Sequence, residues 1–293
     1  MTTGLSQNQL EKIVLQAFIR EVDALKPGNV SRYSDGHNMS AGDFLQSAER
    51  VSPILCDPRL STGERILSSV KATISTVGCN TNLGMLLLFA PVLKVVEESK
   101  LLNINTLQND VKKTLKKIDK NESRLVFEAI CMANPGGLGQ SEKYDVHLAP
   151  DCTVWQAMEQ ASDRDFIAKQ YVNGFDTVIH SGLVKINSYN RRWKSVEWAT
   201  VACYLELLGE HTDSHVVRKL GKAVAQQTSD KARIIARQFE EYDNPAEALD
   251  LLLEYDRELK DSNINPGTTA DITAASLLLF GLCEFCDCRW TNS

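Results

Sequence analysis

The stretch that most constrains the fold is Thr76–Leu93, TVGCNTNLGMLLLFAPVL, in which a polar turn runs directly into a segment that is apolar on every side. A helix without a polar face has to be buried, so we expect a central core helix here. The free N–H groups and the positive dipole end at its start favour an anion such as phosphate. The alternative is that Asn80 or Thr81 only caps the helix. Pro91 is expected to kink the helix or to end its first half.

Nearly every other segment also has helical periodicity. The chain has 293 residues, of which 43% are hydrophobic, and this is ample for a large core. We therefore predict an all-α fold, a compact multi-helix bundle of about a dozen helices around the central buried apolar helix. Residues 1–293 are expected to form a single helical domain.

Particular residues set the expected helix boundaries. Ser6 is expected to cap the first helix, and Gly209 to end a helix over Lys194–Leu208. Thr212 is expected to cap the helix that follows. Three short helices are predicted at Thr153–Ala161, Arg164–Val172 and Phe175–Ile186.

Charge and hydropathy argue against two classes of partner. The net charge of −6 gives no support for nucleic-acid binding. The N-terminus is polar, and the apolar run Leu83–Leu93 is too short to span a bilayer, so we expect no membrane association and a cytoplasmic protein. Cys283, Cys286 and Cys288 form a CxxCxC tail without a fourth ligand nearby, which favours a helix end over a zinc site.

Three acids stand in line with the apolar residues of predicted helices: Glu21, Asp213 and Asp271. A carboxylate on a buried face costs several kcal/mol unless a cation, a metal or a set of donors meets it. Because each acid lies near a Gly, Pro or His loop, we predict a shared acidic site. Mg²⁺ bound together with substrate phosphates fits such oxygen ligands. Glu21 could instead pair with a Lys or Arg, and Asp213 could serve the dipole of its helix.

Several loops could hold a ligand. The first begins at Lys26 and contains His37, and the second runs over Gly136–Glu142, where glycines would let backbone approach a ligand closely. Asp43 is either a ligand or the fourth residue of a capping box that starts at Ser40.

In their order along the chain, these motifs resemble the triphosphoribosyl-dephospho-CoA synthase family, all-helical proteins that make the prosthetic-group precursor of citrate lyase and malonate decarboxylase. The motifs that carry the resemblance are Glu21-Val22 with Lys26-Pro27-Gly28-Asn29-Val30, Asn80-Thr81 with Gly84, the glycine loop Gly136–Glu142, Asp213 with Arg218-Lys219, and Asn265-Pro266-Gly267 with Ala270-Asp271. The chain departs from the family pattern at Asn82 and Leu83, where the family usually has His and Lys. It also lacks the Arg of the family's glycine loop.

The resemblance implies a transferase of cofactor biosynthesis that uses Mg²⁺ and ATP. The 2′-hydroxyl of dephospho-CoA attacks C1′ of the ATP ribose, adenine leaves, and the triphosphate stays on the transferred ribose. On this reading Glu21, Asp213 and Asp271 serve as Mg²⁺ ligands, as the base or as charge-stabilising groups. The residues expected to bind the nucleotide are Lys26, Gly28, Asn29, Asn80, Thr81, Asn82, Gly84, Gly136, Gly137, Gly139, Glu142, Arg218, Lys219, Gly267 and Thr268.

Two other functions are open at this stage. One is a transferase or hydrolase acting on another nucleotide-like or pterin-type cofactor precursor, which the departures from the family pattern would fit. The other is a non-catalytic helical scaffold. Small-molecule nucleotides are the expected partners, and a homodimer is the expected form of any self-association.

Overall fold

Helices make up the regular structure of the chain in the residues that the computed structural model describes: 5–99, 102–136, 143–148 and 151–286. Apart from these helices, this part contains only two isolated β-bridges, Ser31–Ser34 and Gly36–Met39. The all-α prediction is therefore confirmed.

The helices fall into two groups along the chain. The first group contains α1 (Gln7–Asp23), α2 (Ala41–Leu55), α3 (Thr62–Val77), α4 (Leu83–Ser99), α5 (Ile104–Lys117), α6 (Lys120–Ala133), α7 (Val154–Ala161) and α8 (Phe166–Asn173). The second contains α9 (Leu183–Trp193), α10 (Val196–Glu210), α11 (Ser214–Leu220), α12 (Lys222–Glu240), α13 (Leu249–Asp261) and α14 (Gly267–Cys286). Three short turns complete the order: the 3₁₀ turns η1 (Val146–Leu148) and η3 (Pro245–Ala248), and the π turn η2 (Val178–Gly182).

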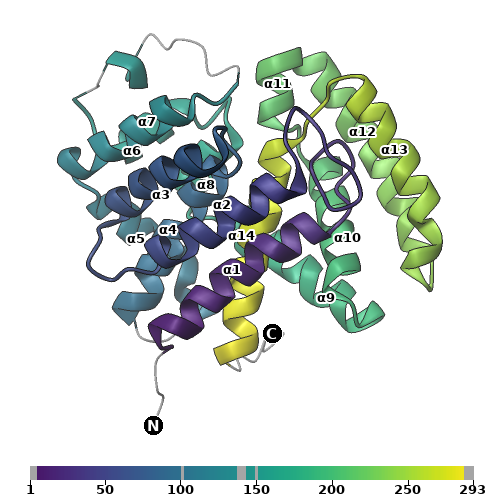
Figure 1. The fold of residues 1–293 in the computed structure, drawn as a ribbon, viewed down its shortest axis with the longest axis horizontal. Helices are drawn as coiled ribbons and strands as arrows, with labels where there is room; N and C mark the ends of the chain where they lie inside the picture. The colour runs from purple at the N-terminus through teal and green to yellow at the C-terminus, as the bar shows by residue number, and fades with distance from the viewer. Residues whose placement is uncertain (1–4, 100–101, 137–142, 149–150, 287–293) are drawn as a thin grey trace.

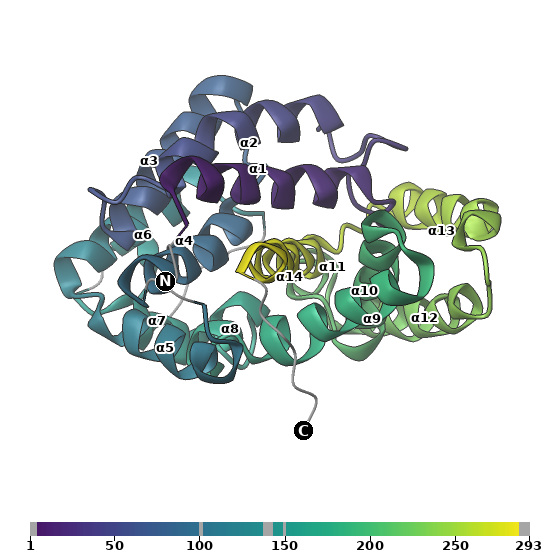
Figure 2. The same ribbon diagram turned by 90° about the horizontal axis from the view of Figure 1, so that it is seen from below.

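The helix at the centre is α14, which lies between the first group and the other helices of the second group (Figure 1). Seen almost end-on, it is surrounded by helices of both groups, and it packs against α1, α4, α8, α9, α10 and α11 (Figure 2). Within the described residues, it is the one helix long and apolar enough to cross a membrane, but 78% of that segment is buried, as in a core helix. The prediction that the helix after Asn82 is central therefore needs a correction, since that helix, α4, is a buried neighbour of α14.

Pro91 lies inside α4, and the helix continues past it to Ser99. Proline has no N–H, so the carbonyl of Leu87, four residues earlier, loses its partner in the helix. The hydroxyl of Tyr171 in α8 donates a hydrogen bond of 2.8 Å to this carbonyl. The expected end of the helix is therefore absent, because a side chain from another helix supplies the missing donor.

Capping residues begin the first two helices as predicted. Ser6 caps α1 and Ser40 caps α2, each within a capping box. The Asp43 carboxylate accepts a hydrogen bond of 2.7 Å from the backbone N–H of Ser40. Of the two roles considered for Asp43, the structure shows the cap.

Two boundaries differ from the prediction because of close helix packing. Gly209 lies inside α10 and does not end it; a Cβ there would lie 3.0 Å from the backbone of Arg233 in α12. The segment predicted as one helix over Phe175–Ile186 contains the π turn η2 and then α9, which runs on to Trp193. A Cβ on Gly182 would lie 2.0 Å from Ser276 Oγ, so this turn brings backbone directly against α14.

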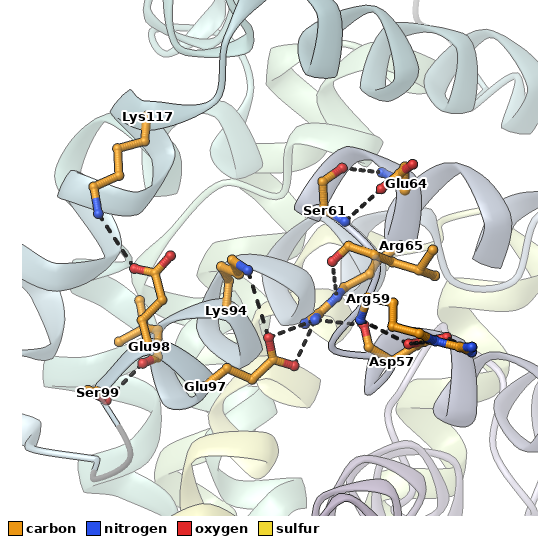
Figure 3. A network of polar contacts seen from close by, with 12 residues as sticks. Asp57, Arg59, Ser61, Glu64, Arg65, Lys94, Glu97, Glu98, Ser99 and Lys117 are labelled. Carbon is orange, nitrogen blue, oxygen red and sulfur yellow. Dashed lines mark hydrogen bonds and ion pairs between the residues drawn. The ribbon is translucent and has the colours of Figure 1, made fainter.

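A buried arginine of α3, Arg65, links the α2–α3 connection to α4 through hydrogen bonds and an ion pair (Figure 3). The Arg65 side chain is fully buried and pairs with Glu97 at 2.7 Å. It also donates hydrogen bonds to the backbone carbonyls of Asp57 and Leu60 at 2.8 and 3.1 Å. Arg59, by contrast, pairs with Asp57 at the surface.

Arg65→Met should lower the free energy of unfolding by about 3 kcal/mol, because it leaves two buried carbonyls without their donor and leaves Glu97 with the more distant Lys94 at 4.0 Å. Urea denaturation followed by circular dichroism measures this change. Arg59→Met removes an exposed ion pair and should leave the midpoint nearly unchanged. Equal losses in the two variants would contradict the view that Arg65 anchors this corner.

Candidate active site

A cavity of about 670 Å³ opens where the N-termini of α4 and α14 meet α11 and the turns that flank α6 and α8. Many of the predicted site residues line it: Asn29, Asn80, Thr81, Asn82, Gly84, Gly136, Arg218, Lys219, Gly267, Thr268 and Asp271. Segments from all parts of the chain therefore converge on one space.

Asp271 directs its carboxylate into this cavity from α14. The carboxylate packs directly on Gly84 of α4, where a Cβ would lie 2.0 Å from Asp271 Oδ2. Among the described residues, no side chain or backbone N–H donates a hydrogen bond to it. Burial raises the pKa of Asp271 well above its ordinary value, and the nearby charges of Glu21 and Asp213 raise it further. The three acids therefore lie near one another, and Asp271 is the one that faces the cavity.

Glu21 lies behind this wall in a buried ion pair. Both Glu21 and Lys26 have fully buried side chains, and Lys26 Nζ lies 3.2 Å from Glu21 Oε1. Lys26 also donates hydrogen bonds to backbone carbonyls, including those of Ala24 at 3.3 Å and Val30 at 3.0 Å. Burial raises the pKa of Glu21 and lowers that of Lys26, and the ion pair opposes both shifts. Neither side chain lines the cavity, so the structure shows the Lys partner considered for Glu21.

Asp213 joins the N-termini of α11 and α14. One carboxylate oxygen accepts from the backbone N–H groups of His215 and Val216 at 2.8 and 3.1 Å. The other accepts from the N–H and the hydroxyl of Thr269 at 2.7 and 2.8 Å. Asp213 is thus the cap of α11, which corrects the expectation that Thr212 caps this helix.

From helical spacing, Asp213 is predicted to lie in line with the apolar residues Val217, Leu220 and Val224, and this prediction is wrong beyond the first turn of α11. This helix ends at Leu220, and Gly221 separates it from α12. Val224 therefore belongs to another helix, and Leu220 is exposed. Asp213 is buried because it caps α11 where this helix packs against α14. The spacing of apolar residues along the sequence did not show this contact.

The loop after α1 reaches the cavity through Asn29. Gly28 has a φ of 81° and donates its N–H to Asp256 at 2.8 Å, and a Cβ there would lie 2.9 Å from the carbonyl oxygen of Ile264. The hydroxyl of Tyr204 donates to the Pro27 carbonyl at 2.8 Å. Asn29 Nδ2 in turn donates to Asn265 Oδ1 at 2.7 Å. Gly28 allows the loop to pack closely against the backbone of Ile264, and Asn29 is the residue of this segment that lines the cavity.

The turn before α4 is held by its own side chains. Asn80 Oδ1 accepts from the N–H groups of Asn82 and Leu83 at 3.3 and 3.0 Å, so Asn80 caps the helix. Thr81 Oγ1 lies 2.8 Å from Ser47 Oγ, and Thr73 donates to Asn82 Oδ1 at 3.1 Å. The capping role considered for Asn80 is therefore present, and the capped turn also forms part of the cavity wall.

Cations form another part of the cavity wall. The Lys219 side chain crosses Gly136, where a Cβ would lie 2.5 Å from Lys219 Cε. Arg218 pairs with Asp165, the residue that caps α8. Of the glycine loop, only its start lies in the described residues; the predicted Gly137, Gly139 and Glu142 fall outside them, as does Cys288 of the cysteine tail.

Several cavity residues were missed by the sequence predictions. His215 packs against Gly267, where a Cβ would lie 2.8 Å from its Nδ1. Burial and the charges of Lys219, Arg218 and His37 lower the pKa of His215 to about 4. Lys143, Arg164 and Asp165 also line the cavity. For these missed residues the sequence offered one signal: an aspartate at the start of a helix, Asp165, is a typical capping residue.

Helix N-termini, cations and a carboxylate that line one cavity of an all-helical protein are typical of binding sites for anionic small molecules. The chain matches the family described as ATP:dephospho-CoA triphosphoribosyl transferase over residues 7–287, and it belongs to that family. The family reaction transfers a triphosphoribosyl group from ATP to dephospho-CoA, so the chain is a transferase of cofactor biosynthesis, as the resemblance implied.

The solved structures with a similar fold include the following one. It is described as a triphosphoribosyl-dephospho-CoA synthase from Archaeoglobus fulgidus, with a TM-score of 0.62 and 23% sequence identity. The similarity covers 80% of this chain and 97% of that one. No curated protein matches the chain.

The contact between Gly84 and Asp271 predicts a coupled pair of substitutions. Gly84→Ala should destabilise the protein by about 1–3 kcal/mol, because the new methyl group meets the Asp271 carboxylate. Adding Asp271→Ala should restore most of this loss, and thermal denaturation of the single and double variants measures the coupling. Gly42→Ala, whose nearest contact would be 3.4 Å, is the matched control and should be neutral or slightly stabilising. Strictly additive losses would contradict the contact.

Asp271→Asn should stabilise the protein at neutral and alkaline pH. In the unfolded chain an aspartate loses its proton near pH 3.8, whereas folded Asp271 keeps it to a higher pH. Stability therefore falls as the pH rises from the unfolded pKa toward the folded one, and Asn removes this penalty. The melting temperature of the variant should exceed that of the wild type by roughly 2 °C for each kcal/mol released, and the gain should vanish in acid. A gain that is independent of pH would refute this account.

Proposed function

We propose that the cavity binds ATP together with Mg²⁺ and that Asp271 is the central functional carboxylate of the transfer reaction. The observation that carries the proposal is the position of Asp271. It is the one acid of the three whose carboxylate lines the cavity, and Glu21 and Asp213 stand behind it. Negative charge at this point favours the cationic, oxocarbenium-like C1′ that forms as the glycosidic bond breaks, as in glycoside hydrolysis.

The triphosphate is placed against the cationic wall. Lys219, Arg218 and the N-terminus of α14 at Gly267 and Thr268 all line the same end of the cavity. Lysine and arginine side chains and free helix N–H groups are the usual partners of phosphate. Lys143 and Arg164 add cations to the wall of the same cavity, in which the family's usual His and Lys are replaced by Asn82 and Leu83. Lys26 is proposed to act indirectly, by holding the loop that presents Asn29.

The donor set suits a magnesium ion that arrives with the phosphates. The described residues contain no group of three His, Cys, Asp or Glu side chains arranged to hold a metal by themselves. Mg²⁺ commonly binds through one or two carboxylates and completes its shell with substrate phosphates and water. Asp271 would hold the ion on the protein side, and the ion would neutralise triphosphate charge. Glu21 and Asp213 would contribute from behind through their negative charge.

The roles of the remaining groups follow from their contacts. Asp213 fixes the relative positions of α11 and α14, and therefore of Lys219 and Asp271. Asn29 and Asn80 shape the polar wall, and His37, which donates to the Gly28 carbonyl at 2.9 Å, closes the loop beside them.

The partners on this proposal are small-molecule nucleotides and not nucleic acids or membranes. The net charge of −6 and the burial of the apolar helix α14 support this view. Soluble substrates of this kind also support a cytoplasmic location.

Adenine release tests the proposal. Wild-type protein with ATP, Mg²⁺ and dephospho-CoA should release adenine, measured by chromatography, and omission of the acceptor should stop it. Asp271→Asn should reduce kcat by about 10²–10⁴-fold while the protein remains folded. Asp230→Asn, an exposed acid on α12, is the control and should retain full activity. Adenine release by Asp271→Asn at the wild-type rate would refute the role of Asp271.

Ligand-dependent unfolding provides an independent check. ATP that binds only the folded state at a hundredfold excess over Kd should stabilise it by roughly 2.7 kcal/mol. The shift in melting temperature should be larger with Mg²⁺ than with a chelator. A shift of equal size under both conditions would argue against the metal.

A further inference from the structure

Helix α13 lies outside the cavity but holds a loop that reaches it. No residue of α13, all of which the structure describes, lines the cavity. The loop over residues 28–39 connects α1 to α2, and Asn29 and His37 of this loop line the cavity. Two side chains of α13, Asp256 and Lys260, contact the same loop. Neither belongs to the proposed chemistry, so their contacts show what α13 contributes.

Asp256 holds the loop at its start. Its side chain is buried, and Oδ1 accepts a hydrogen bond of 2.8 Å from the backbone N–H of Gly28. Oδ2 accepts a hydrogen bond of 3.0 Å from Lys260 Nζ. A buried carboxylate is costly unless donors meet it, and here each oxygen has one. Asp256 therefore ties the backbone of the loop to α13.

Lys260 holds the loop at a second point. Besides the contact with Asp256, its Nζ donates hydrogen bonds to the carbonyl oxygen and the hydroxyl of Ser34, at 3.0 and 2.7 Å. An ammonium group has three protons to donate, and these three contacts use them all. A Cβ on Gly36 would lie 3.0 Å from Lys260 Cε, so the loop backbone runs directly across this side chain. We call Asp256 and Lys260 together the α13 clamp.

The clamp is linked to His37 through Gly28. The carbonyl of Gly28 accepts a hydrogen bond of 2.9 Å from His37 Nε2, while its N–H is held by Asp256. Since a carbonyl can only accept, Nε2 carries the ring proton and Nδ1 remains the acceptor nitrogen of the neutral ring. His37 and Asn38 have φ values of 55° and 62°. Residues other than glycine rarely adopt this conformation, so the turn depends on the contacts around it.

The surroundings favour the neutral form of His37. Burial lowers the pKa of His37, and the nearby charges of Lys219 and Lys260 lower it further, whereas the hydrogen bond to Gly28 and the charge of Asp256 oppose the shift. At neutral pH, His37 is therefore an uncharged ring with one acceptor nitrogen. A hydroxyl or amino group of a ligand in the cavity is the kind of donor that such a nitrogen binds.

We propose that Asp256 and Lys260 are positioning residues for the transfer reaction, which hold the loop over residues 28–39 so that His37 meets the substrate in one fixed ring orientation. This inference rests on the proposed function, because it takes the cavity as the active site. Asn29 also follows Gly28, but its amide has a second support in Asn265. His37 is therefore the cavity residue whose placement depends most directly on the clamp.

The kinetics of Lys260 variants test the clamp. Lys260→Met should lower kcat/KM for ATP in adenine release by about 10–100-fold, because a small displacement of a substrate-binding side chain has an effect of this size. Lys260→Arg, which keeps the charge and several donors, should restore most of the loss. Lys231→Met is the matched control and should keep full activity, since Lys231 pairs with Glu258 of the same helix at the surface.

A double-mutant cycle separates positioning from a general loss of structure. His37→Ala should lower kcat/KM by itself, and adding Lys260→Met to it should cause little further loss. Wild-type activity in either single variant would overturn the proposal, and so would additive losses in the double variant. If Lys260→Met does not fold, Lys260→Gln, which keeps a polar end, replaces it in the same cycle.

The His37 ring also provides a readout that does not depend on catalysis. A ring N–H bonded to a carbonyl is protected from exchange with water, so the wild type without ligand should show a His37 Nε2–H signal in proton NMR spectra. Its loss in His37→Ala assigns the signal. The signal should disappear in Lys260→Met and remain in Lys231→Met, and its retention in Lys260→Met would overturn the clamp. Failure of the proposed function would be seen separately, as adenine release by Asp271→Asn at the wild-type rate, and would not change these signals.

Discussion

The architecture of the cavity depends on one contact, the Asp271 carboxylate against the bare backbone of Gly84. It brings the N-terminal ends of α4 and α14 so close that no side chain fits between them. An acid at such a position is costly to ionise, and two further acids nearby increase the cost. Two of the three acids have partners that stabilise their negative charge: Lys26 pairs with Glu21, and four hydrogen-bond donors contact Asp213. Only Asp271 is left without such a partner in the described chain, and so it is the group that a ligand can complete.

The same arrangement brings different kinds of side chain to one cavity. Cations from α11 and apolar side chains from α6–α8 all line it. Gly267 and Asp271 are four residues apart and therefore lie on one face of α14. A single helix thus positions both the phosphate end and the reacting centre. The N-terminal helices supply the remaining walls, and the site exists only when both halves of the chain have packed on α14.

The sequence predicted the fold class and most of the polar wall, because these depend on local patterns. The period of the apolar residues gave the helices, and the buried line through Glu21 predicted its burial. The sequence could not show which way a side chain points or which distant segment it contacts. Lys26 turns toward Glu21 and backbone carbonyls, and Asp213 joins two helices that are distant in sequence. The corner at Asp165 and His215 depends on how α8 and α11 meet, and no local pattern encodes that packing.

The hydrogen bond from Tyr171 to the carbonyl that Pro91 leaves free has an evolutionary consequence. A proline in the middle of a core helix is acceptable here only while a hydroxyl on α8 stands opposite it. Loss of the tyrosine would be harmful in the presence of the proline and nearly neutral without it. The two positions should therefore change together among related proteins, and the order of their replacement should be constrained: the proline first, the tyrosine afterwards.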